Sequence, residues 1–342
     1  MTPQPPENQD KDRSGQGDGD AARAGSGQGE GPGAGPGAAS GTGSGAASGA
    51  GPGAASGTGP GAAPGSGGRW SDLERPPLNA TALRRALLRS GSLWTGVDVV
   101  SSTGSTNTDL TARAAEGLAE GAVLVAEEQS AARGRLDRRW SAPPRSGLFF
   151  SFYLTPRVPV ERWGWLPLLA GVATASAVAR TAGVDTALKW PNDLLVTVGD
   201  EERKAGGILA ERAGDGVVIG IGLNVTLRAE ELPVPGAGSL ALAGAEVTDR
   251  DPLLRAVLRS VEDWYGQWTA AGGDAAACRL QDAYAAGCAT LGRSVRAELP
   301  GDQALLGEAV AIDGDGRLVL ATEEGMQRPV DAGDIVHVRP AG

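Results

Sequence analysis

The first 68 residues consist mainly of Gly, Ala, Ser, Pro and Thr, and they contain no large apolar side chain apart from Met1. The nonapeptide GPGAASGTG occurs twice in this segment, at 35–43 and 51–59. Such a segment cannot bury enough apolar surface to offset the conformational entropy lost on folding. We therefore expect residues 1–68 to form a disordered tail, and regular structure to lie in the rest of the chain.

The rest of the chain has an ordinary globular composition and is long enough for one large and one small domain. The net charge of −10 does not favour broad contact with nucleic acid or anionic membranes. The most apolar stretch, 165–179, is too short to span a membrane and contains Pro167. We expect a cytoplasmic protein with neither a nucleic-acid nor a membrane partner.

Cysteine and histidine are rare in this chain. Cys278 and Cys288 form no CxxC pair, and His337 is the only histidine. This argues against a disulfide framework and favours a reducing cytosol. It also argues against a His-based metal site and against a Ser-His-Asp triad.

Residues 69–288 alternate between helical and strand patterns, which predicts a mixed α+β domain. Helices are predicted from Asn79, from Asn107 or Thr108 to Gly121, over 166–182 with an early break at Pro167, from Asp251, and over 274–286. The expected apolar positions are Leu83, Leu87 and Leu88 in the first helix, Leu110, Ala114 and Leu118 in the second, and Leu254, Val257, Leu258, Val261 and Trp268 in the helix from Asp251. Strands are predicted over 97–100, 123–126, 147–154, 187–190, 194–198, 207–211 and 217–225, the last two joined by the turn Gly214–Gly216.

After Gly292 the pattern changes to short strands separated by turns, over 294–299, 307–312, 318–321, 327–330 and 335–338. This pattern predicts a small all-β barrel. The domain organisation expected from the sequence is therefore a tail over 1–68, an α+β domain over 69–288 and a β-barrel over 289–342.

An arginine-rich segment follows the strand predicted at 123–126. It holds Arg133, Arg135, Arg138 and Arg139, with Gly134 between the first two. Guanidinium groups bind phosphate and carboxylate oxygens in pairs, and glycine lets the backbone approach a ligand closely. The segment suits a triphosphate or an acyl-adenylate, although a solvated basic loop or a nucleic-acid contact would have the same composition.

Three further motifs carry polar groups at the ends of predicted elements. Lys189-Trp190-Pro191-Asn192-Asp193 ends a strand, a usual place for ligand contact, or simply contains a proline turn. Lys204 enters a strand beside small residues and could stabilise charge on an α-phosphate, although lysines are also common at strand edges. Ser105-Thr106-Asn107 starts a helix, where these residues either recognise a ligand or act only as caps.

The sequence contains neither a Walker A motif nor a nucleophile next to a base. Nucleotide binding would therefore use another device, and the chemistry would be direct attack between two bound reactants.

These four motifs, in this order and spacing, resemble the biotin–protein ligase family over about 70–339. The strand Gly220–Val225 is similar to the core strand of that family, and the C-terminal region resembles its SH3-like domain. The resemblance implies a class II synthetase-like α+β catalytic domain with a mixed sheet. It also implies a two-step reaction, in which biotin and ATP form biotinyl-5′-AMP and a lysine of a biotin carboxyl carrier domain then accepts biotin.

The resemblance also implies roles for individual residues. Lys204 and Arg135 would be catalytic, with Lys204 contacting the carboxylate and the α-phosphate. Biotin would be held by Ser105, Thr106, Asn107, Gln129, Arg133, Gly134, Arg135 and Lys204. ATP would be held by Arg133, Arg135, Lys189, Trp190, Asn192, Asp193 and Asn224. Phosphates and water would hold Mg²⁺, with Asp193 as the candidate protein ligand.

The arginine-rich segment departs from the family pattern, because Ala132 and Asp137 stand where glycines are typical. A lipoate–protein ligase shares the implied fold and is the nearest alternative. A DNA-binding repressor would need a basic winged helix, which residues 1–68 cannot supply. A biotin-binding module without turnover is a third alternative, against which Lys204 and the arginine-rich segment argue by analogy.

Overall fold

The computed structural model describes residues 74–135, 138–299, 303–330 and 334–337, all of which belong to one compact unit, Ala62–Gly342. The predicted tail at 1–68, Asp137 and Val338 lie outside the described residues. Among the helices of the described part, none is both long enough and apolar enough to cross a membrane.

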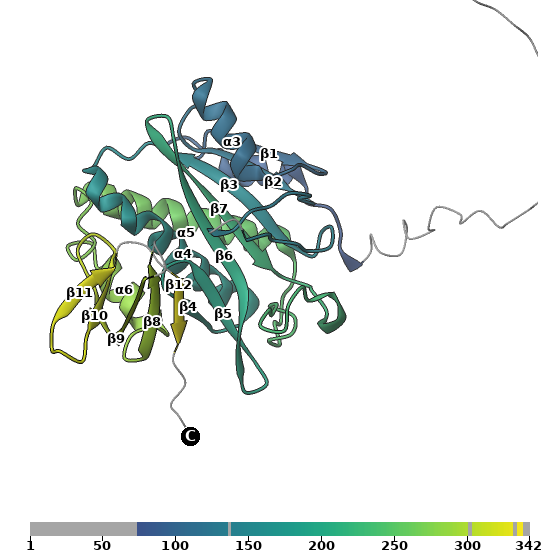
Figure 1. Ribbon diagram of the computed structural model, residues 1–342. Coiled ribbons are helices and arrows are strands. Elements are labelled where there is room, and N and C mark those ends of the chain that lie inside the picture. Colours follow the sequence, from purple (N-terminus) through teal and green to yellow (C-terminus); the bar gives the residue numbers. More distant parts are fainter. Residues whose placement is uncertain (1–73, 136–137, 300–302, 331–333, 338–342) are drawn as a thin grey trace, which may run out of the picture. The chain divides into compact units, whose positions relative to one another are not determined.

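A seven-stranded mixed sheet forms the centre of the larger domain (Figure 1). Its strand order is β1-β2-β3-β7-β6-β5-β4, and only β1 and β2 run parallel to each other among these neighbours. The strands are β1 (Gly96–Val100), β2 (Ala122–Ala126), β3 (Gly147–Leu154), β4 (Thr186–Lys189), β5 (Asp193–Val198), β6 (Glu201–Ala213) and β7 (Gly216–Asn224).

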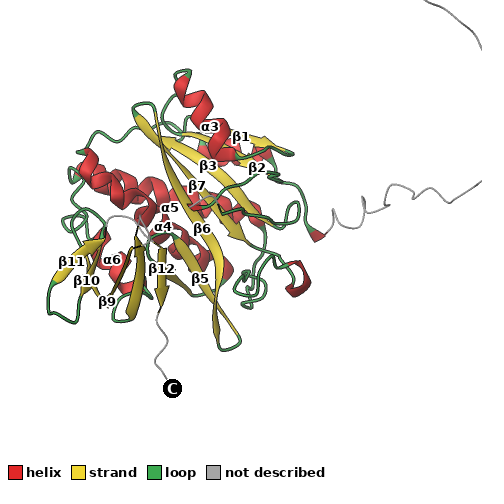
Figure 2. Cartoon of the chain, viewed as in Figure 1, coloured by secondary structure: helices red, strands yellow, loops and turns green. Residues whose placement is uncertain are grey.

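Residue alternation gives the two faces of the central strands different partners. On β7, the side chains of Val217, Ile219, Ile221 and Leu223 join the main core together with buried residues of α4 (Trp165–Ala182) and α5 (Arg250–Ala270). The opposite face packs α3 (Thr106–Ala115), through Leu110 and Ala114 against Tyr153 and Val218. The helices thus cover both faces of the sheet (Figure 2).

Helix positions follow from their caps and apolar stripes. Asn79 caps α2 (Ala80–Leu87), and its Oδ1 accepts a hydrogen bond from the Ala82 N–H at 3.0 Å. Pro167 does not break α4, because it lies in the first turn, where no intrahelical N–H donor is required. The predicted stripe of α5 is confirmed, since Leu254, Val257, Leu258, Val261 and Trp268 are all buried.

Several predicted boundaries are wrong. Helix α3 starts at Thr106 and ends at Ala115, short of Leu118, while Leu88 lies beyond α2 and is exposed. Strand β6 is thirteen residues long, because β5 and β7 extend its pairing over polar positions. Residues 274–279 form turns, so α6 covers only Leu280–Gly287. Short 3₁₀ helices at Val160–Gly164 and Ala229–Glu231 were not predicted.

The C-terminal strands form a separate five-stranded antiparallel sheet of order β11-β10-β9-β8-β12. This antiparallel arrangement is consistent with the SH3-like barrel that was expected. The strands are β8 (Ser294–Leu299), β9 (Gln303–Ile312), β10 (Leu318–Ala321), β11 (Gln327–Val330) and β12 (Asp334–His337).

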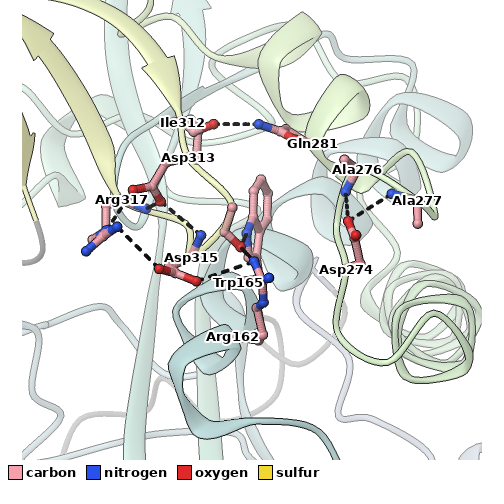
Figure 3. A network of polar contacts seen from close by, with 11 residues as sticks. Arg162, Trp165, Asp274, Ala276, Ala277, Gln281, Ile312, Asp313, Asp315 and Arg317 are labelled. Atoms are coloured by element: carbon pink, nitrogen blue, oxygen red, sulfur yellow. Dashed lines mark hydrogen bonds and ion pairs between the residues drawn. The ribbon is translucent and has the colours of Figure 1, made fainter. Parts of the chain in front are cut away.

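The turn between β9 and β10 docks the barrel on the larger domain (Figure 3). The Gly314 carbonyl accepts hydrogen bonds from Arg162 Nη1 at 2.6 Å and from the Trp165 indole at 2.9 Å. The Gly316 carbonyl accepts one from the Trp190 indole at 3.0 Å. Gly164 permits this docking, because a Cβ there would lie 2.3 Å from the Asp315 carbonyl oxygen.

Candidate functional site

The candidate site begins where the N-terminus of α3 meets the middle of the sheet. Ser105 caps the helix, and its hydroxyl accepts a hydrogen bond from the Thr108 N–H at 3.4 Å. Thr106 and Asn107 follow in the first turn and are buried. The Thr106 N–H donates to Gln129 Oε1 at 2.8 Å, which joins the helix to the segment after β2.

Glycines on β6 and β7 make the floor of the site. Gly207 pairs with Gly222, and Gly220 pairs with Leu209. A Cβ at Gly220 would lie 2.0 Å from Asn107 Oδ1, and a Cβ at Gly222 would lie 3.2 Å from the Trp140 ring. The missing side chains let Asn107 and the Trp140 indole lie directly against the sheet.

The first of two adjoining pockets lies over this floor and has a volume of about 50 Å³. Its polar lining comes from Ser105, Asn107, Gln129 and Arg133, while the Trp140 ring and the glycine backbone supply apolar surface. Such a small cavity with a few convergent polar groups suits the head of a small, partly polar ligand.

The second pocket is larger, about 500 Å³, and it shares Gly134 and Trp140 with the first. Its polar lining comes from Arg135, Arg138, Arg139, Lys204, Asp193, Asn192, Ser141 and Asn224, and its apolar lining includes Pro233 and Val234. Four of these side chains are cationic and one is a carboxylate, so the lining favours an anionic ligand such as a polyphosphate.

Lys204 lies at the border between the two pockets. Its Nζ is 2.5 Å from Asp193 Oδ1 and 5.8 Å from the centroid of the Trp140 ring. A Cβ at Gly207, on the floor of the first pocket, would lie 3.5 Å from the same Nζ. A cation in this position can interact with the reacting groups of ligands in both pockets.

Two cations near Asp193, Arg135 and Lys189, have lowered pKa values because they are partly buried. Burial lowers the pKa of Arg135, and Asp193 opposes this effect. Burial also lowers the pKa of Lys189, as do Lys204 and Arg138, while Asp193 again acts in the opposite direction. Asp193 is therefore a common counter-charge for the cations at this edge of the sheet.

The structure brings most of the predicted site residues together. Ser105, Asn107, Gln129, Arg133 and Gly134 line the first pocket, and Gly134, Arg135, Asn192, Asp193, Lys204 and Asn224 line the second. Thr106 lies behind the first pocket and holds Gln129. The side-chain amides of Asn192 and Asn224 also have structural partners, the carbonyls of Ile208 and Gly238, both at 2.9 Å.

Lys189 and Trp190 line neither of these pockets. The Trp190 side chain is buried and its indole donates to the Gly316 carbonyl of the barrel, so this residue makes a domain contact, and its contact with the nucleotide stays a prediction. The two residues after Pro191, Asn192 and Asp193, line the second pocket.

No role was predicted for Trp140, Ser151, Glu211 or the segment 233–237. Ser151 is the only serine in the aromatic and aliphatic strand GLFFSFYL, which marks the position as unusual but does not indicate its partner Asn107. Trp140 ends the arginine-rich segment already considered. The segment 233–237 carries no local signal, because its position depends on pairing of Lys204 with Gly236 and Gly238.

The chain is similar in sequence to known proteins over both of its domains. Residues 99–224 match the biotin/lipoate A/B protein ligase family, and residues 290–338 match the biotin protein ligase C-terminal domain. The biotin–acetyl-CoA-carboxylase ligase of Mycobacterium tuberculosis is 45% identical over 273 residues, covering 78% of this chain and 98% of the relative.

Two further relatives extend the comparison. The bifunctional ligase/repressor BirA of Bacillus subtilis is 34% identical over 239 residues, which are 68% of this chain and 70% of that protein. The biotin protein ligase of Aquifex aeolicus, solved in complex with biotin and ATP, superposes with a TM-score of 0.59 and 26% identity, covering 72% of this chain and 100% of that one. This chain belongs to the biotin–protein ligase family.

Proposed function

We propose that this chain activates biotin with ATP to biotinyl-5′-AMP and transfers the biotinyl group to a lysine of a biotin carboxyl carrier domain of acetyl-CoA carboxylase. The observation that carries this proposal is the adjacency of the two pockets, with Lys204 at their border. A small acid and a polyphosphate bound in these pockets would meet beside one cation.

In the first step, a carboxylate oxygen of biotin forms a bond to the α-phosphorus of ATP. The bond between that phosphorus and the bridging oxygen breaks, and pyrophosphate leaves with the electron pair. Lys204 and Arg135, both lining the second pocket, would stabilise the negative charge that gathers on the α-phosphate oxygens. Positioning of the two reactants then supplies most of the remaining rate enhancement.

In the second step, the amine of the acceptor lysine attacks the acyl carbon of the adenylate. The amine nitrogen forms the amide bond and loses a proton to solvent, and AMP leaves with the electrons of the carbon–oxygen bond. The exposed residues Arg138 and Arg139 line the mouth of the second pocket, where an acceptor lysine would approach.

The donor set at the second pocket fits a magnesium ion that arrives with ATP. Among the described residues, no group of three or more His, Cys, Asp or Glu side chains could hold a metal. Asp193 would contribute one carboxylate oxygen, and phosphates and water would fill the other positions, as Mg²⁺ prefers. When bound, the ion would neutralise charge on the phosphates.

The polar inner end of the first pocket favours biotin over lipoate. A ureido ring offers two N–H donors and one carbonyl acceptor to Ser105, Asn107 and Gln129. The dithiolane ring of lipoate offers none of these and would lack the corresponding hydrogen bonds, each with a net value of about 0.5–1.5 kcal/mol. The ligase would act in the cytoplasm, and the acidic chain is not expected to bind DNA as a repressor.

The test is to incubate the full chain with ATP, Mg²⁺ and a carboxylase carrier domain, and to follow labelling of the carrier by mass. Biotin is expected to add its acyl mass to one lysine, and lipoate is not. Labelling by lipoate alone would assign the site to the lipoate branch of the family. Biotin binding without pyrophosphate release would leave only a binding role.

A further inference from the structure

A chain of buried hydrogen bonds runs beneath the N-terminus of α3 and joins residues of three elements. The hydroxyls of Thr106 and Ser151 lie 2.6 Å apart, and Ser151 Oγ lies 2.6 Å from Asn107 Oδ1. The exposed fractions of Thr106, Asn107 and Ser151 are 3%, 5% and 0%. Each group is therefore shielded from water and depends on the others for its hydrogen bonds.

The directions of these hydrogen bonds follow from the number of protons. Ser151 has one hydroxyl proton and donates it to Asn107 Oδ1, so it accepts from Thr106. The single hydroxyl proton of Thr106 then goes to Ser151 rather than to Gln129 Oε1 at 3.2 Å, and Gln129 still accepts from the Thr106 N–H. On the other side, Asn107 Nδ2 donates to Glu211 Oε2 at 2.8 Å and to the Leu209 carbonyl at 3.2 Å. Both amide protons are used, and the Asn107 amide is held in one orientation.

The fixed orientation has a consequence for a ligand. Asn107 Oδ1 lies over Gly220 on the floor of the first pocket and retains a second lone pair. With its N–H groups occupied, Asn107 can accept a hydrogen bond from a ligand but cannot donate one. The same Glu211 also pairs with Arg133 at 3.2 Å, so it holds the two walls of the pocket together.

We propose that Ser151 and Glu211 are positioning residues that determine specificity for a cyclic urea, because they lock the Asn107 amide with its acceptor toward the ligand. This inference rests on the proposed function, since biotin is the ligand whose ureido N–H would use that acceptor. Neither residue lines the pocket, and both act through Asn107.

The test measures binding of biotin and of ATP by calorimetry for wild type, Ser151→Ala, Glu211→Ala and Glu211→Gln. Ser151→Ala and Glu211→Ala are expected to weaken biotin binding about tenfold, the loss of one net hydrogen bond, and to leave ATP binding unchanged. Glu211→Gln keeps an acceptor for Asn107 Nδ2 and is expected to restore most of the affinity. Glu201→Gln, which removes an exposed ion pair with Arg203 on the same strand, is the matched control.

A double-mutant cycle separates positioning from general damage. If Ser151 acts through Asn107, Asn107→Ala combined with Ser151→Ala binds biotin no more weakly than Asn107→Ala alone. Additive losses, equal losses for biotin and ATP, or biotin affinities within twofold of wild type would each overturn the inference. Wild type that binds biotin but releases no pyrophosphate would refute the proposed catalysis while leaving this inference intact.

Discussion

Replacement of Trp190 by phenylalanine tests whether the barrel positions the second pocket. The change removes the indole donor to the Gly316 carbonyl at 3.0 Å, in a side chain that is 3% exposed. A buried carbonyl that loses its donor costs about 1–3 kcal/mol. The residues that follow, Asn192 and Asp193, line the second pocket, so the affinity for ATP is also expected to fall.

Trp165→Phe is the matched control for this experiment. Trp165 is equally buried and its indole donates to the Gly314 carbonyl, but that carbonyl keeps Arg162 as a second donor at 2.6 Å. Its hydrogen bond is therefore worth only about 0.5–1.5 kcal/mol. Both variants lose the same side-chain volume. The difference between their free energies of unfolding therefore reports the cost of leaving the Gly316 carbonyl without a donor.

Thermal unfolding and the KM for ATP are the two readouts. Trp190→Phe is expected to cost about 1 kcal/mol more than Trp165→Phe, which corresponds to a Tm about 2–4 °C lower. Only Trp190→Phe should raise the KM for ATP. Equal Tm values, or a normal KM in a destabilised Trp190→Phe protein, would refute the reasoning.

Three further perturbations follow from the same contacts. Gly220→Ala places a methyl group 2.0 Å from Asn107 Oδ1 and should abolish the biotin binding that calorimetry measures. The control Gly266→Ala adds a methyl group in open space on α5 and should leave biotin binding unchanged. Biotin binding by Gly220→Ala would contradict the close contact. Arg250→Met leaves Glu127 buried without its ion pair and should cost about 3–5 kcal/mol in denaturant unfolding. Arg228→Met removes the exposed ion pair with Glu74 and should lower the free energy of unfolding by under about 1 kcal/mol. Similar losses in Arg250→Met and Arg228→Met would contradict the argument from burial. Burial lowers the pKa of His337 from 6.5 to about 4, so the unfolded chain takes up the proton first as the pH falls, and stability should decrease from pH 6.5 to pH 4. His337→Gln should flatten this dependence of Tm on pH. The same dependence of Tm on pH in wild type and His337→Gln would exclude His337 as its source.

The sequence predicted the elements whose apolar pattern is strong. Strand β3 was predicted to the residue, and α5 was predicted with its buried stripe, because a fully apolar run and a long helical stripe each permit one arrangement. Strand β6 was underestimated, because its N-terminal half is polar and is held by pairing with β5, which is not visible locally.

The same distinction applies to the site. Motifs that carry their own chemistry, such as Lys204 and the arginine-rich segment, could be recognised before the structure was known. Ser151 and Glu211 could not, because their importance depends on contacts with Asn107 across 44 and 104 positions of sequence. The motif around Trp190 did not indicate that the indole contacts the barrel, because a motif shows which residues lie together and not where each side chain points.

The most direct test of the central claim is to isolate the acyl-adenylate. The full chain would be mixed with ATP, Mg²⁺ and biotin without an acceptor, and biotinyl-5′-AMP would be followed by mass spectrometry in a single turnover. Wild type and Arg203→Ala, an ion-paired neighbour of Lys204, should form the adenylate at similar rates, and Lys204→Ala should be slower by about 10²–10³. Absence of the adenylate in wild type, or equal rates in wild type and Lys204→Ala, would contradict the account.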